Sequence, residues 1–445
     1  MKTSDLKVSI SGIRGIVGQS LTPQLVIKFA EAFSTYIGGG NIAVASDTRR
    51  SKEMVKSAVF AGLLSCGASP LDLGVLPIPS LQIYTKEHRL DGAISVTASH
   101  NPVEWNALKL IKGEGRFLFP YEAEDLLDFY YQGKFRRVEQ PLTIRNDERG
   151  FQPHLKKIME SFDLVVIRER GFKVAVDPCG GAAAPYVSRF LSELGVDVVE
   201  VNTEITGTFP RNPEPLAENL AALSDAVKKS GADIGLAQDA DADRLAAVDE
   251  KGDPIGEEYT LALAVEGYLQ YRRRSPVVVN LSTSRVLEEI ARKSKVKLIR
   301  TKVGEINVAR AMGRIGARIG GEGNGGIIVS DVHLCRDSFS GMALLLESLA
   351  KSGAGLSELK RRLPAYSMIK TKQDVPHRKR KAILNRLLLK FPQGNRETSD
   401  GLRIDYPEFW FHVRPSNTEP VMRIIVEARD TETAQRVLAG IKEEI

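Results

Sequence analysis

The chain has 445 residues and a formal net charge of +6, with 42% hydrophobic and 27% charged residues. This composition is typical of a soluble globular protein, and the length suggests about three domains. The three cysteines (Cys66, Cys179 and Cys335) are too few and too widely spaced for a disulfide framework or a zinc cluster. The positive charge favours anionic partners, either nucleic acid or a phosphorylated small molecule.

Neither a targeting segment nor a membrane span is evident. No N-terminal stretch joins a basic region to an apolar core, and no apolar run is long enough to cross a bilayer. We therefore expect a cytoplasmic protein with no membrane partner. Two basic clusters, residues 272–274 and 378–381, lack the interleaved aromatics and motifs of nucleic-acid-binding proteins. They predict solvated helix ends, and nucleic acid is not an expected partner.

The first elements alternate between strand and helix. Residues 41–45 predict a strand, and residues 46–51 predict a helix start, with Asp and Ser as cap candidates. A helical pattern with apolar residues four apart follows. Next come an apolar run at 71–76, another helix, and a buried strand at 93–96 that ends in a polar loop containing Ser99.

The same order recurs twice, and each cycle ends in a polar loop, at residues 239–244 and 320–326. Three α/β units of this kind predict repeated domains that face one cleft. The second cycle has strands at 172–176, 196–201 and 233–237, and helices at 184–194 and 216–229. The third has strands at 277–280, 296–300 and 317–319, and helices at 259–269, 285–293 and 306–315.

The last segment differs in pattern. A basic helix at 378–390 precedes a strand from 409, a polar loop, a strand at 421–426 and a helix from Thr431. The expected fold is α/β, with three successive α/β/α domains on mixed sheets and a smaller C-terminal α+β domain around a central cleft. The expected domains are 1–150, 151–250, 251–367 and 368–445.

Ser99 stands at the carboxyl end of a predicted strand. Ligands bind at that edge of open α/β sheets, so a hydroxyl flanked by His100 and Asn101 suits nucleophilic or phosphoryl chemistry. The alternative is an ordinary polar turn before Pro102.

Asp239, Asp241 and Asp243 alternate in sequence, so in an extended segment their carboxylates would share one face. Such like charges need a cation, and hard oxygen ligands select Mg²⁺ or Ca²⁺. An EF-hand loop is excluded because Arg244 stands where that loop needs glycine. The alternative is an acidic turn in solvent.

A divalent cation beside Ser99 would make the serine a phosphoryl carrier. Lys109 and His100 are the nearest ionisable candidates for proton transfer, and Arg244 is a fixed electrostatic partner because it does not deprotonate. Arg14, between two glycines, could be held rigidly towards an anion.

Two further loops offer ligand-binding groups. Arg414, Ser416, Asn417 and Thr418, with Arg423 beyond them, suit a non-reacting phosphate, and the alternative is a capped turn. In the glycine-rich loop, Glu322 and Asn324 suit sugar hydroxyls, and the alternative is a flexible loop. A dinucleotide fingerprint is not supported, because no helix opens directly after that loop.

Four motifs together resemble the α-D-phosphohexomutase superfamily, which includes phosphoglucomutase, phosphomannomutase and phosphoglucosamine mutase. The resemblance spans nearly the whole chain in the right order. The motifs are residues 97–102 with Asn106 and Lys109, residues 239–244, residues 321–325 and residues 414–420; residues 9–15, 207–210 and 213–215 resemble further family segments.

The resemblance implies an isomerase that interconverts hexose 6-phosphate and hexose 1-phosphate through phosphorylated Ser99 and a hexose 1,6-bisphosphate. It implies Mg²⁺ held by Ser99 and the three aspartates, with Arg14, His100, Lys109 and Arg244 as further catalytic candidates. The expected partner is a phosphorylated hexose, and the expected assembly is a monomer or homodimer. The candidate substrate-binding residues are Gly304, Glu322, Asn324, Arg414, Ser416, Asn417, Thr418 and Arg423.

The chain also departs from the family pattern. Asn324 and Gly326 stand where the family commonly has Ser and His, Ile78 replaces Thr between two prolines, and Cys335 precedes Arg336-Asp337 where glycine is usual. The glycine-rich loop resembles archaeal-type phosphoglucosamine mutases. A phosphomannomutase or phosphoglucomutase remains the alternative within the superfamily, and a non-catalytic phosphosugar-binding protein is the alternative outside it.

Overall fold

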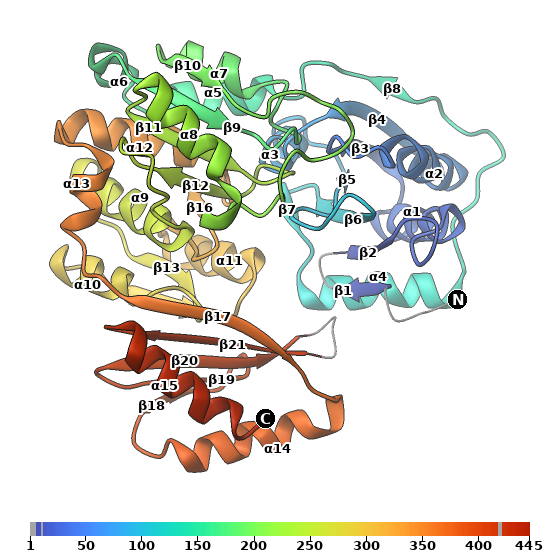
Figure 1. Ribbon diagram of the computed structural model, residues 1–445. Coiled ribbons are helices and arrows are strands. Elements are labelled where there is room, and N and C mark those ends of the chain that lie inside the picture. Colours follow the sequence, from blue (N-terminus) through green and yellow to red (C-terminus); the bar gives the residue numbers. More distant parts are fainter. Residues whose placement is uncertain (1–5, 10–11, 417–420) are drawn as a thin grey trace.

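The computed structural model describes residues 6–9, 12–416 and 421–445, and four β-sheets define its four domains (Figure 1). Domain I contains an eight-stranded sheet with the order β1-β2-β6-β5-β3-β4-β8, in which β7 pairs with β6. Its strands are β1 (Lys7–Ser9), β2 (Gly12–Ile16), β3 (Gly40–Ser46), β4 (Ala68–Val75), β5 (Gly92–Val96), β6 (Trp105–Lys112), β7 (Arg116–Phe117) and β8 (Arg145–Asn146). Its helices are α1 (Pro23–Ile37), α2 (Lys52–Ser65), α3 (Ile78–Glu87) and α4 (Pro120–Gln132).

Domains II and III each contain a four-stranded sheet. Domain II has strands β9 (Lys173–Asp177), β10 (Asp197–Glu200), β11 (Ile234–Gln238) and β12 (Leu245–Val248), and helices α5 (Gln152–Ser161), α6 (Leu164–Arg170), α7 (Val187–Glu193) and α8 (Ala221–Ser230). Domain III has strands β13 (Val277–Asn280), β14 (Leu298–Thr301), β15 (Ile319–Glu322) and β16 (Gly326–Val329), and helices α9 (Glu257–Tyr271), α10 (Val286–Lys293), α11 (Glu305–Ile315), α12 (Ser338–Ser352) and α13 (Leu356–Arg361).

The three domains repeat one strand order. The central strands run β4-β3-β5-β6, β10-β9-β11-β12 and β14-β13-β15-β16, and the last strand of each set is antiparallel to its neighbour. Each set therefore ends in an equivalent hairpin, beyond which β2 and β1 extend the sheet of domain I, and these hairpins carry the three polar loops that follow β5, β11 and β15. The predicted repeat of α/β units is confirmed.

Domain IV is built differently. Its five strands form an antiparallel sheet in the order β17-β21-β20-β19-β18. The elements are β17 (Ser367–Asp374), α14 (His377–Lys390), β18 (Asn395–Glu397), β19 (Leu402–Asp405), β20 (Phe409–Pro415), β21 (Val421–Ala428) and α15 (Thr431–Lys442). In Figure 1 this domain, in orange and red, lies beneath domain III, and β17 leads into it. The predicted fold class is confirmed.

The hydrophobic core divides the molecule in the same way. One continuous cluster joins buried residues from domains I, II and III, for example Leu81, Val174 and Val279. Domain IV has a separate cluster that includes Ile383 and Phe411. Among residues 6–9, 12–416 and 421–445, no helix is both long and apolar enough to cross a membrane.

Some predicted element bounds were wrong. Helix α2 begins at Lys52, directly after the cap candidate Ser51, which occupies the N-cap position without a side-chain cap hydrogen bond; the other candidate, Asp47, pairs with Arg49. Helix α7 is shorter than predicted, since Ala182 N–H donates to Ala240 O at 2.8 Å and residues 182–186 form turns. Two prolines precede α8, and a short 3₁₀ helix (Ala217–Asn219) delays its start. Strand β15 extends into the glycine-rich run as far as Glu322.

Candidate active site

Ser99 lies on the loop that follows the fully buried strand β5. It is 3% exposed and has a φ of 51°, a left-handed conformation that is uncommon for residues other than glycine. Its Oγ donates a hydrogen bond of 2.9 Å to Asp239 Oδ2, so the loop of domain I touches the loop of domain II. The sequence placed both residues at carboxyl ends of strands, and the structure brings them into contact.

A buried ion pair that the sequence did not predict supports the Ser99 loop. Arg49 donates to the carbonyls of Ser99, at 2.9 Å, and of Asn101, and it pairs with Asp47. Asp47 also accepts from Thr97 Oγ1 at 2.6 Å, and burial raises the pKa of its carboxyl. Asp47 and Arg49 directly follow a parallel strand, and this position could have indicated that they belong to the site. The sequence pattern instead predicts a helix start there.

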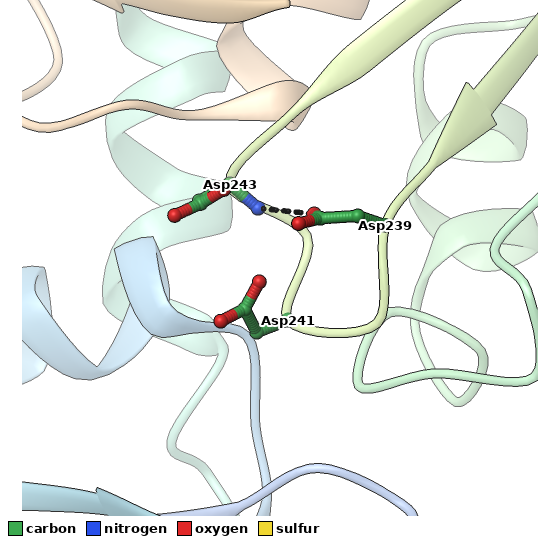
Figure 2. Close-up of side chains that lie close together, drawn as sticks. All are labelled: Asp239, Asp241 and Asp243. Carbon is green, nitrogen blue, oxygen red and sulfur yellow. Dashed lines mark hydrogen bonds between the residues drawn. The ribbon is translucent and has the colours of Figure 1, made fainter. Parts of the chain in front are cut away.

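The three aspartates lie on a turn between β11 and β12, not on an extended segment as predicted (Figure 2). Ala242 has a φ of 59°, which helps to reverse the chain. The N–H of Asp243, 3.1 Å from Asp239 Oδ1, also fixes the turn. One oxygen from each of Asp239, Asp241 and Asp243 lies within 4.8 Å of the others. The three carboxylates lie close together as predicted, but a turn brings them together and not the alternation of side chains along a strand.

The electrostatics of this triplet fit a hard divalent cation. Burial, reinforced by the two neighbouring carboxylates, raises the pKa of Asp239 well above its usual value. Burial alone would also raise the pKa of Asp241, but Lys109 Nζ at 2.7 Å reverses the effect and lowers it. Asp241 Oδ1 and Asp243 Oδ1 are buried without a hydrogen-bond partner. Buried carboxylate oxygens without a hydrogen-bond partner are the hard ligands that Mg²⁺ prefers.

A cavity of about 750 Å³ lies beside this cluster and is lined by all four domains. Ser99 itself is buried next to His100, which lines the cavity. Among the lining residues are Arg14, His100 and Lys109 of domain I, Glu214 and Arg244 of domain II, Glu257, Glu258, Asn280 and Asn324 of domain III, and Lys370, Arg414 and Arg423 of domain IV. The cavity is therefore positively charged at the end near Ser99 and at the domain IV end.

His100 is held among cations. Its Nδ1 lies 3.1 Å from Nη2 of Arg244, which in turn pairs with Glu214 at 3.0 Å. Burial, with the charges of Arg244 and Arg14, lowers the pKa of His100 well below 6.5. Since arginine only donates, Nδ1 is assigned as the acceptor and Nε2 carries the proton of the neutral ring. Arg14 donates to the side chain of Asn101.

The predicted sugar residues Glu322 and Gly304 are in contact. Glu322 is 2% exposed, and its Oε1 accepts from Gly304 N–H and from Asn280 Nδ2, both at 2.7 Å. Its Oε2 accepts from Arg336 at 2.9 Å. The wall of the cavity next to it is formed by Gly323 and by Asn324.

In domain IV, Arg414 on β20 and Arg423 on β21 are register partners and line the cavity. Burial lowers the pKa of Arg414, although Asp400 lies 3.9 Å away. Ser416 is 5% exposed, and its carbonyl accepts from Arg380 at 3.0 Å. The predicted residues Asn417 and Thr418 lie outside the described residues.

Lys370 is a cavity residue that sequence reasoning missed. It lies on β17, and its Nζ is 2.9 Å from Glu257 and 2.8 Å from Glu258 of domain III. Burial, only partly offset by Lys370, raises the pKa of Glu258 to about 7. Nothing in the pattern around these residues distinguished them from an exposed strand and a helix start, because their contact joins residues more than 100 positions apart.

Comparison with known proteins identifies the family. The phosphoglucomutase/phosphomannomutase α/β/α domains I, II and III match residues 5–137, 152–252 and 256–366, and the C-terminal domain of the same family matches residues 370–444.

Individual relatives match over their full length. A phosphoglucomutase/phosphomannomutase of Thermococcus kodakarensis is 38% identical, covering 97% of this chain and 96% of the relative. A phosphoglucosamine/phosphogalactosamine mutase of Sulfurisphaera tokodaii is 32% identical, covering 97% of each chain. The crystal structure of a phosphoglucomutase/phosphomannomutase family protein from Burkholderia thailandensis superimposes with a TM-score of 0.87 at 27% identity, covering 98% of this chain and 96% of the other.

The chain belongs to the phosphoglucomutase/phosphomannomutase family, and with it to the α-D-phosphohexomutase superfamily. It is a phosphohexomutase, which is an isomerase.

Proposed function

We propose that the enzyme moves a phosphoryl group between the 6- and 1-positions of a hexose by way of phosphorylated Ser99 and a hexose 1,6-bisphosphate. The observation that carries the proposal is the contact of 2.9 Å between Ser99 Oγ and Asp239. It places a hydroxyl at a buried carboxylate triplet, beside a cavity whose far end carries Arg414 and Arg423.

The aspartate triplet and an oxygen of phosphorylated Ser99 would hold Mg²⁺. The support is the pair of buried carboxylate oxygens, on Asp241 and Asp243, that have no hydrogen-bond partner. When bound, Mg²⁺ neutralises charge that develops on the transferring phosphoryl group. Lys109 holds Asp241 in place through its contact of 2.7 Å.

The transfer conserves phosphate. As the bond between Ser99 Oγ and phosphorus breaks, the serine oxygen keeps the electron pair, and a hydroxyl oxygen of the sugar phosphate bonds to the phosphorus and gives up its proton. The bisphosphate then turns over in the cavity, and its other phosphate returns to Ser99. A volume of about 750 Å³ gives room for this reorientation.

The proton has two candidate carriers that both line the cavity, His100 and Lys109. His100 is neutral, with Nδ1 turned to Arg244 and its proton on Nε2, so Nε2 can donate a hydrogen bond to a substrate oxygen and a proton that the ring takes up would go to Nδ1. Lys109 Nζ is paired with Asp241 and lies 3.8 Å from Asp243. The pH profiles of kcat in His100→Gln and Lys109→Met separate them, because the profile loses one limb when its titrating group is removed.

The remaining polar side chains of the cavity bind the part of the substrate that does not react. Arg414 and Arg423 offer guanidinium groups to the second phosphate. Asn324 faces the sugar hydroxyls from the domain III wall.

Replacing Ser99 tests the proposal. Ser99→Ala removes the phosphate carrier, so mutase turnover should fall by about 10⁴-fold or more. The fold should persist, because the hydroxyl makes one hydrogen bond. The matched control is Ser352→Ala, at the end of α12. Turnover within tenfold of the wild type in a folded Ser99→Ala protein rejects the phosphoserine route.

For the substrate, we propose an amino hexose phosphate. The Sulfurisphaera relative is named for glucosamine and galactosamine phosphates, whereas the Thermococcus relative is named for glucose and mannose phosphates. The test is kcat/KM on the 6-phosphates of glucosamine, glucose and mannose with a bisphosphate activator. A preference for glucosamine 6-phosphate supports the proposal, and a preference for either neutral sugar assigns the alternative.

A further inference from the structure

Arg336 connects the metal loop (residues 239–244) with the sugar loop (residues 320–326), which the proposed mechanism uses separately. Its Nη2 donates to Asp243 Oδ2 in the metal loop, and its Nη1 donates to Glu322 Oε2 in the sugar loop at 2.9 Å. Its Nε lies 3.2 Å from Glu305 Oε2, at the start of α11. The side chain is 11% exposed, so one buried guanidinium faces three carboxylates from two domains.

The backbone of Arg336 is fixed on its C-terminal side. Asp337 caps α12 and lies 2.9 Å from Nε2 of His154, a fully buried residue of α5. Ser338 Oγ donates to the carbonyl of Ala242, inside the metal loop, at 2.6 Å. Two adjacent residues thus anchor the segment to the core and to the metal loop. An arginine whose backbone is anchored in this way loses little conformational entropy when a ligand binds.

The sugar loop leaves space for this side chain. A Cβ atom at Gly326 would lie 2.2 Å from Cδ of Arg336, so the arginine passes through space that any other residue at 326 would fill. Gly326 departs from the family pattern, and it lies against Arg336, the residue that follows the second departure, Cys335. The pair therefore forms one structural unit of this chain.

The hydrogen bonds of Arg336 fix one oxygen of each of two buried carboxylates. Arg336 occupies Asp243 Oδ2, and Asp243 Oδ1 is the buried atom without a hydrogen-bond partner. Glu322 Oε1 is held by Asn280 and Gly304, so Arg336 completes the fixation of that carboxylate through Oε2. One guanidinium thus sets the orientation of a metal-facing carboxylate and of the sugar-loop carboxylate.

We propose that Arg336 is a positioning residue that couples the metal loop to the sugar loop, so that Mg²⁺ and the hexose ring each bind more tightly when the other is present. This inference rests on the proposed function. Reciprocal coupling of this kind is on the order of tenfold in affinity. The phosphate group also attracts Mg²⁺ by charge alone, so the measurement must separate the ring from the phosphate.

The experiment measures Mg²⁺ affinity by calorimetry in the dephosphorylated full chain, where no turnover occurs. The protein is saturated first with glucosamine 6-phosphate and then, separately, with inorganic phosphate, which lacks the ring. In the wild type, the sugar phosphate should tighten Mg²⁺ binding on the order of tenfold more than inorganic phosphate does. In Arg336→Gln the two ligands should act equally.

Two further variants complete the test. Arg336→Lys keeps the positive charge and reaches fewer carboxylates, so it should retain part of the difference; it also serves if Arg336→Gln does not fold. Arg318→Gln removes an arginine that pairs with Asp331 on the surface of domain III, and it should behave as the wild type.

Coupling in a folded Arg336→Gln or Arg336→Lys protein equal to that of the wild type overturns the inference, as does a wild type that shows no difference between the ligands. Either result leaves phosphorylation of Ser99 untouched. A protein that is never phosphorylated on Ser99 contradicts the proposed function instead, so the two failures are distinguishable.

Discussion

Domains I to III and domain IV are built on different principles. The first three contribute to one large hydrophobic cluster, although domain I also has a second cluster that includes Val96 and Leu108. Buried contacts such as Ser99 to Asp239 and Lys109 to Asp241 join domains I and II. Domain IV has its own core, and Arg414 and Arg423 line the cavity from its sheet. The residues that we propose to react therefore lie in domains that pack on a common cluster, whereas the residues that we propose to bind the second phosphate, Arg414 and Arg423, lie in a domain with a separate core.

Domain IV is held to domain III mainly by polar contacts. Lys370 pairs with Glu257 and Glu258, Asp400 accepts from Val303 N–H at 2.9 Å, and Arg403 donates to a domain III carbonyl. Substitutions of site residues in domains I to III should therefore change kcat and metal affinity, and substitutions of cavity residues in domain IV should change KM.

After Ser99→Ala, the largest effect is expected for Asp241→Asn. The change removes a charged oxygen from the triplet and leaves Lys109 with Asp243 alone, at 3.8 Å. Mg²⁺ affinity and kcat should each fall by more than about 100-fold, because even the groups that only orient metal ligands contribute 10–100-fold. Calorimetry and steady-state kinetics check this, with exposed Asp253→Asn as the control. An unchanged Mg²⁺ affinity would mean that the triplet is not the metal site.

The contact between domains III and IV should depend on pH. Burial raises the pKa of Glu258 from 4.5 to about 7, so the folded protein binds a proton that the unfolded chain has released. This contribution to stability is fully present below about pH 4.5 and is lost as the pH rises through 7. Its full size is about 3 kcal/mol. In Glu258→Gln it is absent, so the wild type should lose stability relative to the variant over this range.

Urea unfolding at pH 4.5, 6 and 8, followed by tryptophan fluorescence, measures this difference. Of the two tryptophans, Trp105 lies on β6 of domain I and Trp410 is buried in domain IV. Exposed Glu218→Gln should parallel the wild type at every pH. If the difference in the free energy of unfolding between the wild type and Glu258→Gln is the same at all three pH values, Glu258 is ionised at each of them and Lys370 stabilises its charge.

Arg414→Gln should act on binding. Loss of a charged hydrogen bond to phosphate is worth about 1.5–3 kcal/mol, which raises KM about 10–150-fold. The value of kcat should change little, because Arg414 lies outside the shared core of domains I to III. Steady-state kinetics with exposed Arg429→Gln as the control measure this. A decrease confined to kcat would contradict the assignment of Arg414 to substrate binding and not to the chemical step.

The smallest effect is expected for Asn324→Ala. Its side chain lines the cavity and makes one long internal hydrogen bond, 3.3 Å from Gly326 N–H, so most of its capacity faces the ligand. Loss of a neutral hydrogen bond should lower kcat/KM about 2–10-fold. The loss should differ between glucosamine and glucose 6-phosphates. If Asn324→Ala weakens the binding of inorganic phosphate, measured as a competitive inhibitor, by the same factor as it lowers kcat/KM, Asn324 does not contact the sugar ring.

The sequence predicted the loops better than the contacts between them. Strand patterns placed Ser99 and the aspartates at carboxyl ends of strands, and residues at equivalent edges of repeated domains meet in the structure. The geometry of the aspartate loop was wrong, because period-2 alternation describes strands and Ala242 lies in a left-handed turn. Loop conformation depends on its local hydrogen bonds, which the pattern does not encode.

Contacts between distant positions were not predictable. Each of Arg49, Arg336 and Lys370 has a partner 50 or more positions away, and none lies in a periodic pattern that marks these contacts. A buried arginine and an exposed one look alike in sequence, since burial depends on carboxylates that only the fold brings near.

The most direct test of the central claim is the intact mass of the purified enzyme before and after exposure to a hexose phosphate. We predict one phosphate per chain after incubation with glucose 1,6-bisphosphate, located on Ser99 by peptide mapping, and its transfer to hexose 6-phosphate with bisphosphate as the product. A chain that turns substrate over while Ser99 never carries phosphate would contradict the account.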